Sequence, residues 1–128
     1  MTTFDTKAER ARDLATSTEY AIVITTCADR DSAKIIARQL LEDKLTACVQ
    51  LFPIESIYIW QDELCENGEV MLLIKTRTVL FQRVAGCIKR NHPYKVPEIV
   101  QVPLTSGLPE YLSWIDDNTQ WDPARCSF

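Results

Sequence analysis

The residues best suited to chemistry lie in one short segment, which holds the only histidine of the chain. His92 is followed by Pro93, and a second proline, Pro97, precedes Glu98. Each proline fixes its own φ at about −65° and keeps the preceding residue out of the helical region, so His92 should be extended within a stiff connector. An imidazole displayed in this way can ligate a metal or hold a turn together, and the residues alone favour the turn.

Cys27 is the thiol that could complete a metal site. It follows the first apolar run, at the start of a loop into a predicted helix, where the helix dipole would favour a thiolate. Copper or zinc would use His92 with Cys27, or ligands from neighbouring subunits, because the chain has no Cys-x-x-Cys, no His-x-x-x-His and no second histidine. We therefore expect no tightly bound cofactor and at most weak binding of copper or another divalent metal. A structural, partly buried Cys27 is the alternative.

Four further side chains could line a ligand cleft. Lys75, Glu69 and Glu98 could act as acid and base groups beside Tyr94, although ion pairs between them are the simpler interpretation. The chain has no Gly-rich phosphate loop, and its sequence supports no Ser-His-Asp triad. We expect a binding or regulatory protein and not an enzyme.

Composition limits the partners and the location. With 128 residues, of which 46% are hydrophobic, the chain suits one domain. A net charge of −4 with dispersed Lys and Arg argues against nucleic acid, and the apolar runs are too short to span a bilayer. The five cysteines are odd in number and widely spaced, as expected for reduced thiols. The N-terminal segment has no apolar signal region and carries carboxylates, so a cytoplasmic protein is expected.

The elements that position these residues follow from apolar periodicity and turn chemistry. We expect one domain over residues 20–119, a partly helical or disordered extension over 1–19 and a tail over 120–128. Extended runs are predicted at 20–26, 47–60, 69–77 and 98–102. Helices are predicted at 30–44, from a cap at Thr78 to about 91, and from Pro109 onward.

This order predicts an α+β, ferredoxin-like β-α-β-β-α-β fold with an antiparallel sheet, a long hairpin arm and a C-terminal helix. Right-handed crossovers place both main helices on one face of the sheet. The run over 47–60 is about twice the usual strand length, so its distal half should project. Four apolar residues lie there and should pair with another subunit, namely Ile57, Tyr58, Ile59 and Trp60.

Five ordered motifs resemble those of the CutA family of divalent-cation-tolerance proteins, over about residues 20–118. They are Thr25-Thr26, Leu45-Thr46-Ala47-Cys48-Val49, Ser56-Ile57-Tyr58-Ile59-Trp60, Lys75-Thr76 and His92-Pro93-Tyr94 with Pro97-Glu98, and Tyr111-Leu112-Ser113-Trp114 supports them. The resemblance implies a ferredoxin-like subunit, a homotrimer similar to PII signalling proteins and a link to copper or other divalent-metal tolerance. It implies no known reaction.

The chain departs from the copper-ligand pattern that the resemblance implies. Some bacterial members bind copper through a cysteine at the end of the first strand and two adjacent histidines in the connector. Here Thr25 occupies the cysteine position, and Asn91 stands where the first histidine would be. Of the three ligands, only His92 carries over.

Three functional hypotheses follow. The first is a cytoplasmic homotrimer that responds to divalent metals, copper foremost, through His92 and Cys27. The second is a PII-like signalling trimer whose intersubunit clefts, lined by Lys75, Tyr94, Glu98 and Glu69, hold a small anionic ligand or a protein partner. The third, an acylphosphatase-like enzyme, is disfavoured by the missing phosphate loop.

Overall fold

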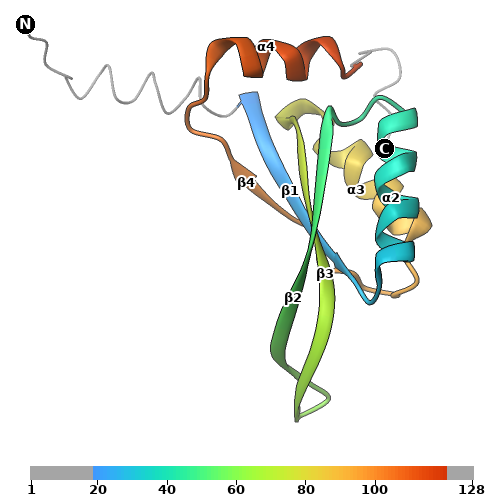
Figure 1. Cartoon of the computed structure of the whole chain (residues 1–128). Helices are drawn as coiled ribbons and strands as arrows, with labels where there is room; N and C mark the ends of the chain where they lie inside the picture. Colours follow the sequence, from blue (N-terminus) through green and yellow to red (C-terminus); the bar gives the residue numbers. More distant parts are fainter. Residues whose placement is uncertain (1–18, 121–128) are drawn as a thin grey trace, which may run out of the picture.

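A computed structural model describes residues 19–120, and its elements follow the predicted order (Figure 1). In chain order they are β1 (Tyr20–Cys27), α2 (Arg30–Glu42), β2 (Cys48–Trp60), β3 (Glu63–Arg77), the 3₁₀ turn η2 (Thr78–Leu80), α3 (Phe81–Asn91), β4 (Val100–Pro103) and α4 (Pro109–Asp117). The predicted N-terminal extension and C-terminal tail lie, except for residues 19 and 120, outside the described residues.

The strands form one antiparallel sheet in the order β2-β3-β1-β4, which confirms the ferredoxin-like prediction. Strands β2 and β4 are therefore its edges. Pro53 lies in β2 opposite Val70 of β3. A proline is tolerated there because an edge strand has one side on which no ladder hydrogen bond is required.

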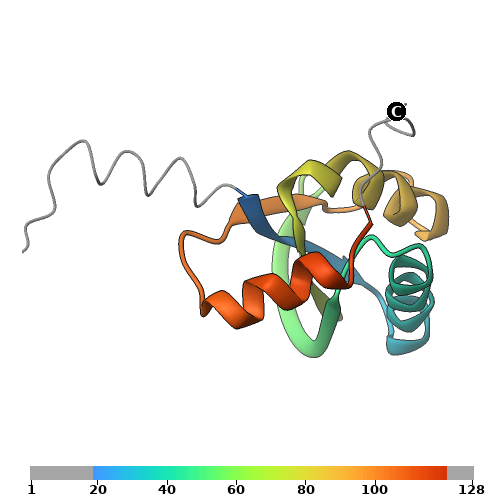
Figure 2. The same ribbon diagram turned by 90° about the horizontal axis from the view of Figure 1, so that it is seen from above.

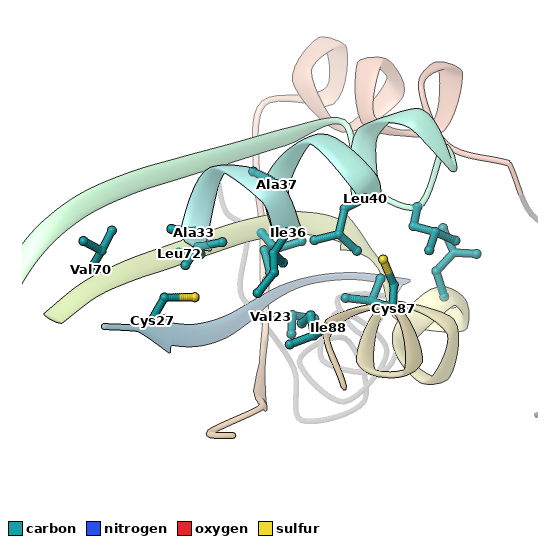
Figure 3. Close-up of a cluster of buried hydrophobic side chains, with 14 residues drawn as sticks. Val23, Cys27, Ala33, Ile36, Ala37, Leu40, Val70, Leu72, Cys87 and Ile88 are labelled. Atoms are coloured by element: carbon teal, nitrogen blue, oxygen red, sulfur yellow. The ribbon is translucent and has the colours of Figure 1, made fainter. Parts of the chain in front are cut away.

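Helices α2 and α3 cover one face of the sheet and enclose the hydrophobic core (Figures 1 and 2). Side chains of β1 and β3 alternate, so that Val23 and Cys27 point to the helices together with Leu72 and Ile74. Ile36 and Leu40 of α2 pack onto them from above (Figure 3). This side of the sheet is closed within one chain.

The other face of the sheet, which we call the open sheet face, is also apolar. Register places its side chains next to one another: Ile22, Ile24, Phe52, Met71, Leu73, Val100 and Val102. Phe52, Val100 and Val102 are 40%, 46% and 44% exposed, and the other four are partly buried. Among the described helices, α4 alone lies on this side, across the end of the sheet at Tyr20 and Arg77, so the rest of the apolar surface is left to solvent (Figure 2).

Helix α2 has a well-formed start and an unusual end. The carboxylate of Asp29 accepts the backbone N–H of Ser32 at 2.8 Å, as a helix N-cap should. At the other end, the N–H of Leu45 donates to the carbonyl of Leu40 at 3.0 Å across Lys44, whose φ is 59°. That left-handed position normally holds glycine.

The hairpin arm is longer than predicted. Strand β3 begins at Glu63, six residues before the predicted start at Glu69, so the polar stretch 61–68 is mostly strand. Gln61 and Asp62 alone make the turn, with φ values of 49° and 65°. Two successive positive φ angles give the tight turn that suits the twist of a hairpin, although this pair lacks the Asn-Gly signature that would reveal it.

Two smaller predictions also need correction. Thr78 does not cap α3 directly, because η2 intervenes and Leu80 occupies the N-cap position of α3. Strand β4 begins at Val100, so Glu98 lies in the connector. By contrast, Pro109 opens α4 as predicted. Helix α4 is tied to the sheet through Asp116, which accepts the hydroxyl of Tyr20 at 2.7 Å and pairs with Arg77 at 3.4 Å.

Candidate functional site

His92 and Cys27 meet where the connector after α3 passes the end of β1. His92 follows the last residue of α3 and is extended, with φ −93° and ψ 135°, as the following proline requires. Its Nε2 atom lies 2.7 Å from the carbonyl oxygen of Thr26 and 3.8 Å from Sγ of Cys27. The structure thus brings together the two residues that the sequence proposed as metal ligands.

Both ring nitrogens of His92 already have hydrogen-bond partners. A carbonyl oxygen can only accept, so Nε2 carries the hydrogen that it donates to Thr26. The backbone N–H of Tyr94 donates to Nδ1 at 3.1 Å. The ring is only 8% exposed, and its centroid lies 4.7 Å from that of Tyr94. His92 therefore fastens the connector to the sheet, the structural role that the sequence favoured.

Cys27 differs from its predicted setting. It is the last residue of β1 and not the first of a loop, and it is fully buried. Burial raises the pKa of the thiol to about 11, and the carboxylates of Asp29 and Glu69 add to the rise. Desolvation and two nearby acids thus favour the neutral thiol, which fits the structural, buried Cys27 better than the thiolate that the helix dipole could have favoured.

The two positions at which the chain departs from the family's copper ligands have other roles. Thr25 is fully buried, and its Oγ1 has no hydrogen-bond partner among the described residues. Asn91 turns back to its own helix, where Nδ2 donates to the carbonyl of Cys87 at 2.8 Å. Within residues 19–120, no group of three or more His, Cys, Asp or Glu side chains could hold a metal. The described part of one chain thus offers the Cys27 and His92 pair and no larger set of ligands.

The four predicted cleft residues do not converge within one chain. Tyr94 is close enough to Glu69 for that carboxylate to raise the pKa of the phenol, second to burial. Lys75 lies six residues further along β3, about 20 Å away at roughly 3.3 Å per residue. Its Nζ donates to Gln50 and stands 6.0 Å from the ring centroid of Tyr111. Glu98 is exposed in the connector.

The predicted interface residues lie on the projecting arm. Ile57, Ile59 and Trp60 are 66%, 66% and 62% exposed, whereas Tyr58 is 39% exposed and accepts a hydrogen bond from Asn67. Leu64, which was not among the predicted interface residues, is 69% exposed on the returning strand. In the sequence, Leu64 stands out as a large apolar residue within the polar stretch 61–68, and this could have marked it as an interface residue. In the structure it lies directly opposite Ile59.

A family model described as CutA1 divalent ion tolerance protein matches residues 21–118. The chain belongs to the CutA1 family. It is similar to the divalent-cation tolerance protein CutA of Thermus thermophilus, with 43% identity over 99 residues that cover 77% of this chain and 96% of the relative. The solved CutA structure from Archaeoglobus fulgidus superposes with a TM-score of 0.77 at 36% identity and covers 79% of this chain and 99% of that one.

The comparisons contradict the expected cytoplasmic location. The Archaeoglobus fulgidus CutA protein is described as periplasmic. A chloroplastic CutA protein of Arabidopsis thaliana is 36% identical over 77% of this chain, which spans 55% of that relative's length. Some proteins of the CutA1 family are therefore described as lying outside the cytoplasm. Membership of the family does not by itself determine the compartment. Within residues 19–120, no helix is long and apolar enough to cross a membrane.

Proposed function

We propose that this CutA1 protein works as a homotrimer in the tolerance of divalent metal ions, with copper as the first candidate, and that it binds its ligand without transforming it. The projecting arm carries the proposal for assembly. Seven residue pairs, from Ile54 opposite Glu69 to Trp60 opposite Glu63, extend beyond the last pair of β1 with β3. At roughly 3.3 Å per residue, the arm is about 20 Å long.

An arm of this kind is unstable in isolation. A two-stranded ribbon has little stability in water, and here it exposes apolar side chains and the unpaired backbone edge of β2. Pairing with another subunit would remove both costs. The open sheet face supports the same conclusion, since contiguous exposed apolar surface marks an interaction site.

A closed ring is the proposed arrangement because each chain presents two different surfaces, the arm and the open sheet face, and the number of three copies rests on the family resemblance. When one surface of a copy contacts the other surface of the next copy, the contact is heterologous, and a ring closes it without leaving unpaired surfaces. The likeness to PII trimers that the sequence suggested fits this closed arrangement. The PII-like alternative itself gains no support within one chain, because Lys75 lies far from Glu69 and Tyr94.

Metal contact at Cys27 and His92 is proposed to be weak. To bind there, a divalent ion would have to replace the Nε2–H bond to Thr26 and displace the proton of a thiol whose pKa is about 11. The resulting two ligands are fewer than the four of an ordinary structural zinc site. Further ligands would have to come from another subunit of the trimer.

A titration tests this function. Copper and zinc are added to the parent protein, to Cys27→Ala and to His92→Ala, and binding is followed by calorimetry. We expect weak saturable binding by the parent and at least tenfold weaker binding by each variant. Val96→Ala, which alters an 83% exposed residue of the same connector, is the control. Equal binding by the parent and both variants would rule out this pair as the metal site.

A further inference from the structure

A second site is indicated on the helix layer, away from the arm and the open sheet face. A groove of about 770 Å³ runs between the C-terminal end of α2 and the outer side of α3. Four cationic side chains line it, Lys44 from the end of α2 and Arg83, Lys89 and Arg90 from α3. This is a concentration of positive charge in a protein whose net charge is −4.

Among residues 19–120, these cations have no carboxylate partner within 4.0 Å. In that part of the chain, the ion pair within this distance is the one between Arg77 and Asp116, neither of which lines the groove. Glu42 and Asp43 also line the groove, but Asp43 accepts a hydrogen bond from Gln39 of its own helix at 3.1 Å. The lining therefore keeps a net positive charge of about two, and its guanidinium groups are free to bind an anion.

Two residues of the groove have a residue type that is unfavourable for their backbone conformation. Lys44 has a φ of 59° at a helix end where glycine fits better. Gly86 lies inside α3, where a glycine weakens a helix. A Cβ atom at Gly86 would stand 3.4 Å from Nη1 of Arg90, so this glycine lies directly beside that guanidinium. Departures from local rules tend to gather at functional sites, and these two share one groove.

We infer that this groove binds a small polyanion of the oligophosphate class. Arginine guanidinium groups donate two parallel hydrogen bonds to phosphate oxygens, and lysine ammonium groups add point charges. The volume is within the range of small-molecule sites, roughly 300–1,000 Å³. The apolar lining is limited to small or buried groups such as Ala85 and Leu45, which offers little to the side chains of a peptide.

The groove lies apart from the surfaces that are assigned to assembly in the proposed trimer. It lies on the side of the sheet that α2 and α3 cover, whereas assembly is assigned to the opposite face and to the arm (Figures 1 and 2). Its occupation is also independent of the Cys27 and His92 pair. If no metal binds at Cys27 and His92, the inference about the groove still stands. If no anion binds in the groove, the proposal for Cys27 and His92 still stands.

Calorimetry with sodium tripolyphosphate tests the inference. The full chain is titrated at low salt with EDTA present, so that no metal takes part. We expect saturable binding of one tripolyphosphate per subunit, weakened at least tenfold in Arg83→Gln and in Arg90→Gln. Arg38→Gln removes the same charge from an exposed position of α2 outside the groove and should change the Kd less than twofold.

Lys44→Gly separates binding from folding. It removes a cation and also relieves the left-handed strain, so we expect weaker tripolyphosphate binding together with a higher melting temperature. The inference is overturned if the parent shows no saturable binding, if Arg38→Gln weakens binding as much as Arg83→Gln, or if Lys44→Gly binds as tightly as the parent. Tighter binding of an acidic octapeptide at the same residues would also overturn it, in favour of a protein partner.

Discussion

The Nε2 atom of His92 lies 2.7 Å from the carbonyl oxygen of Thr26, and this contact joins the connector after α3 to the end of β1. It uses the imidazole as a bridge between two segments that are 66 residues apart in the chain. Because the backbone N–H of Tyr94 occupies the other ring nitrogen, the ring is fully engaged in structure. The sole histidine of the chain is thus a structural element before it is a ligand.

His92→Ala should therefore destabilise the fold. The substitution leaves the buried carbonyl of Thr26 and the N–H of Tyr94 without these partners and removes a buried ring, at a cost of about 2–3 kcal/mol. Urea unfolding at fixed protein concentration measures it. Val96→Ala in the same connector should change the stability by less than about 0.5 kcal/mol. Equal midpoints and slopes for His92→Ala and the parent would show that the bridge contributes nothing.

Thr25 should tolerate the loss of its hydroxyl. Its buried Oγ1 has no hydrogen-bond partner among residues 19–120, so Thr25→Val keeps the shape and removes an unsatisfied polar atom, which should stabilise the fold by about 1 kcal/mol. Thr76 is the matched contrast, because its hydroxyl donates to the carbonyl of Leu45 at 2.6 Å. Thr76→Val should destabilise by about 1–3 kcal/mol. Thermal melts of both variants decide this, and a destabilised Thr25→Val would contradict it.

Stability should fall in mildly alkaline solution through Cys27. Folding raises the pKa of this thiol from 9.0 to about 11, so its contribution is complete below pH 9 and is lost as the pH rises through 11. The loss amounts to about 3 kcal/mol at the upper end, because the shift is two pKa units at about 1.4 kcal/mol per unit. Tyr20, whose pKa the bond to Asp116 raises to about 12, adds a fall at higher pH.

Cys27→Ala should remove the part of this fall that lies between pH 9 and pH 11. Denaturant unfolding measured at intervals across that range gives the slope of stability against pH. Val70→Ala is the control, because it deletes a buried apolar group opposite Cys27 and titrates nothing. Its curve should be lower than that of the parent at every pH but parallel to it. A Cys27→Ala curve parallel to the parent would contradict the assignment.

The sequence predicted the architecture well where local and global signals agreed. The apolar, β-branched run of β1 predicts a buried strand, and the 3.6-residue period of α2 predicts a helix, with no competing signal in either segment. Prediction failed at Gln61 and Asp62, where a tight turn forms without the usual residues, so a polar strand was taken for a loop. Arm residues such as Leu64 lack the alternation that one buried face imposes, since the described chain offers the arm no core.

The candidate site was predicted only in part, because its properties depend on tertiary contacts. The paired prolines correctly placed His92 in an extended connector. No feature of the sequence indicated that the ring would bond to Thr26, or that Cys27 would belong to the strand and not to the loop after it. The groove of α2 and α3 was missed because its four cations are dispersed in the sequence and meet only when two helices pack.

Charges placed on the arm should prevent assembly. Ile57→Asp and Ile59→Asp introduce a carboxylate at positions proposed to be buried between subunits, and each should weaken association at least 100-fold. Ile35→Asp makes the same change at a 57% exposed site on α2 and should leave assembly intact. Size-exclusion chromatography with light scattering distinguishes the variants. Loss of assembly in Ile35→Asp as well would indicate general unfolding.

Sedimentation equilibrium of the parent protein tests the central claim most directly. One chain has a mass of 14.7 kDa, so a homotrimer should sediment as a single species of about 44 kDa at micromolar concentration. A stable species of 14.7 kDa over the same concentration range would contradict the account, because the arm and the open sheet face would then be exposed in the functional protein.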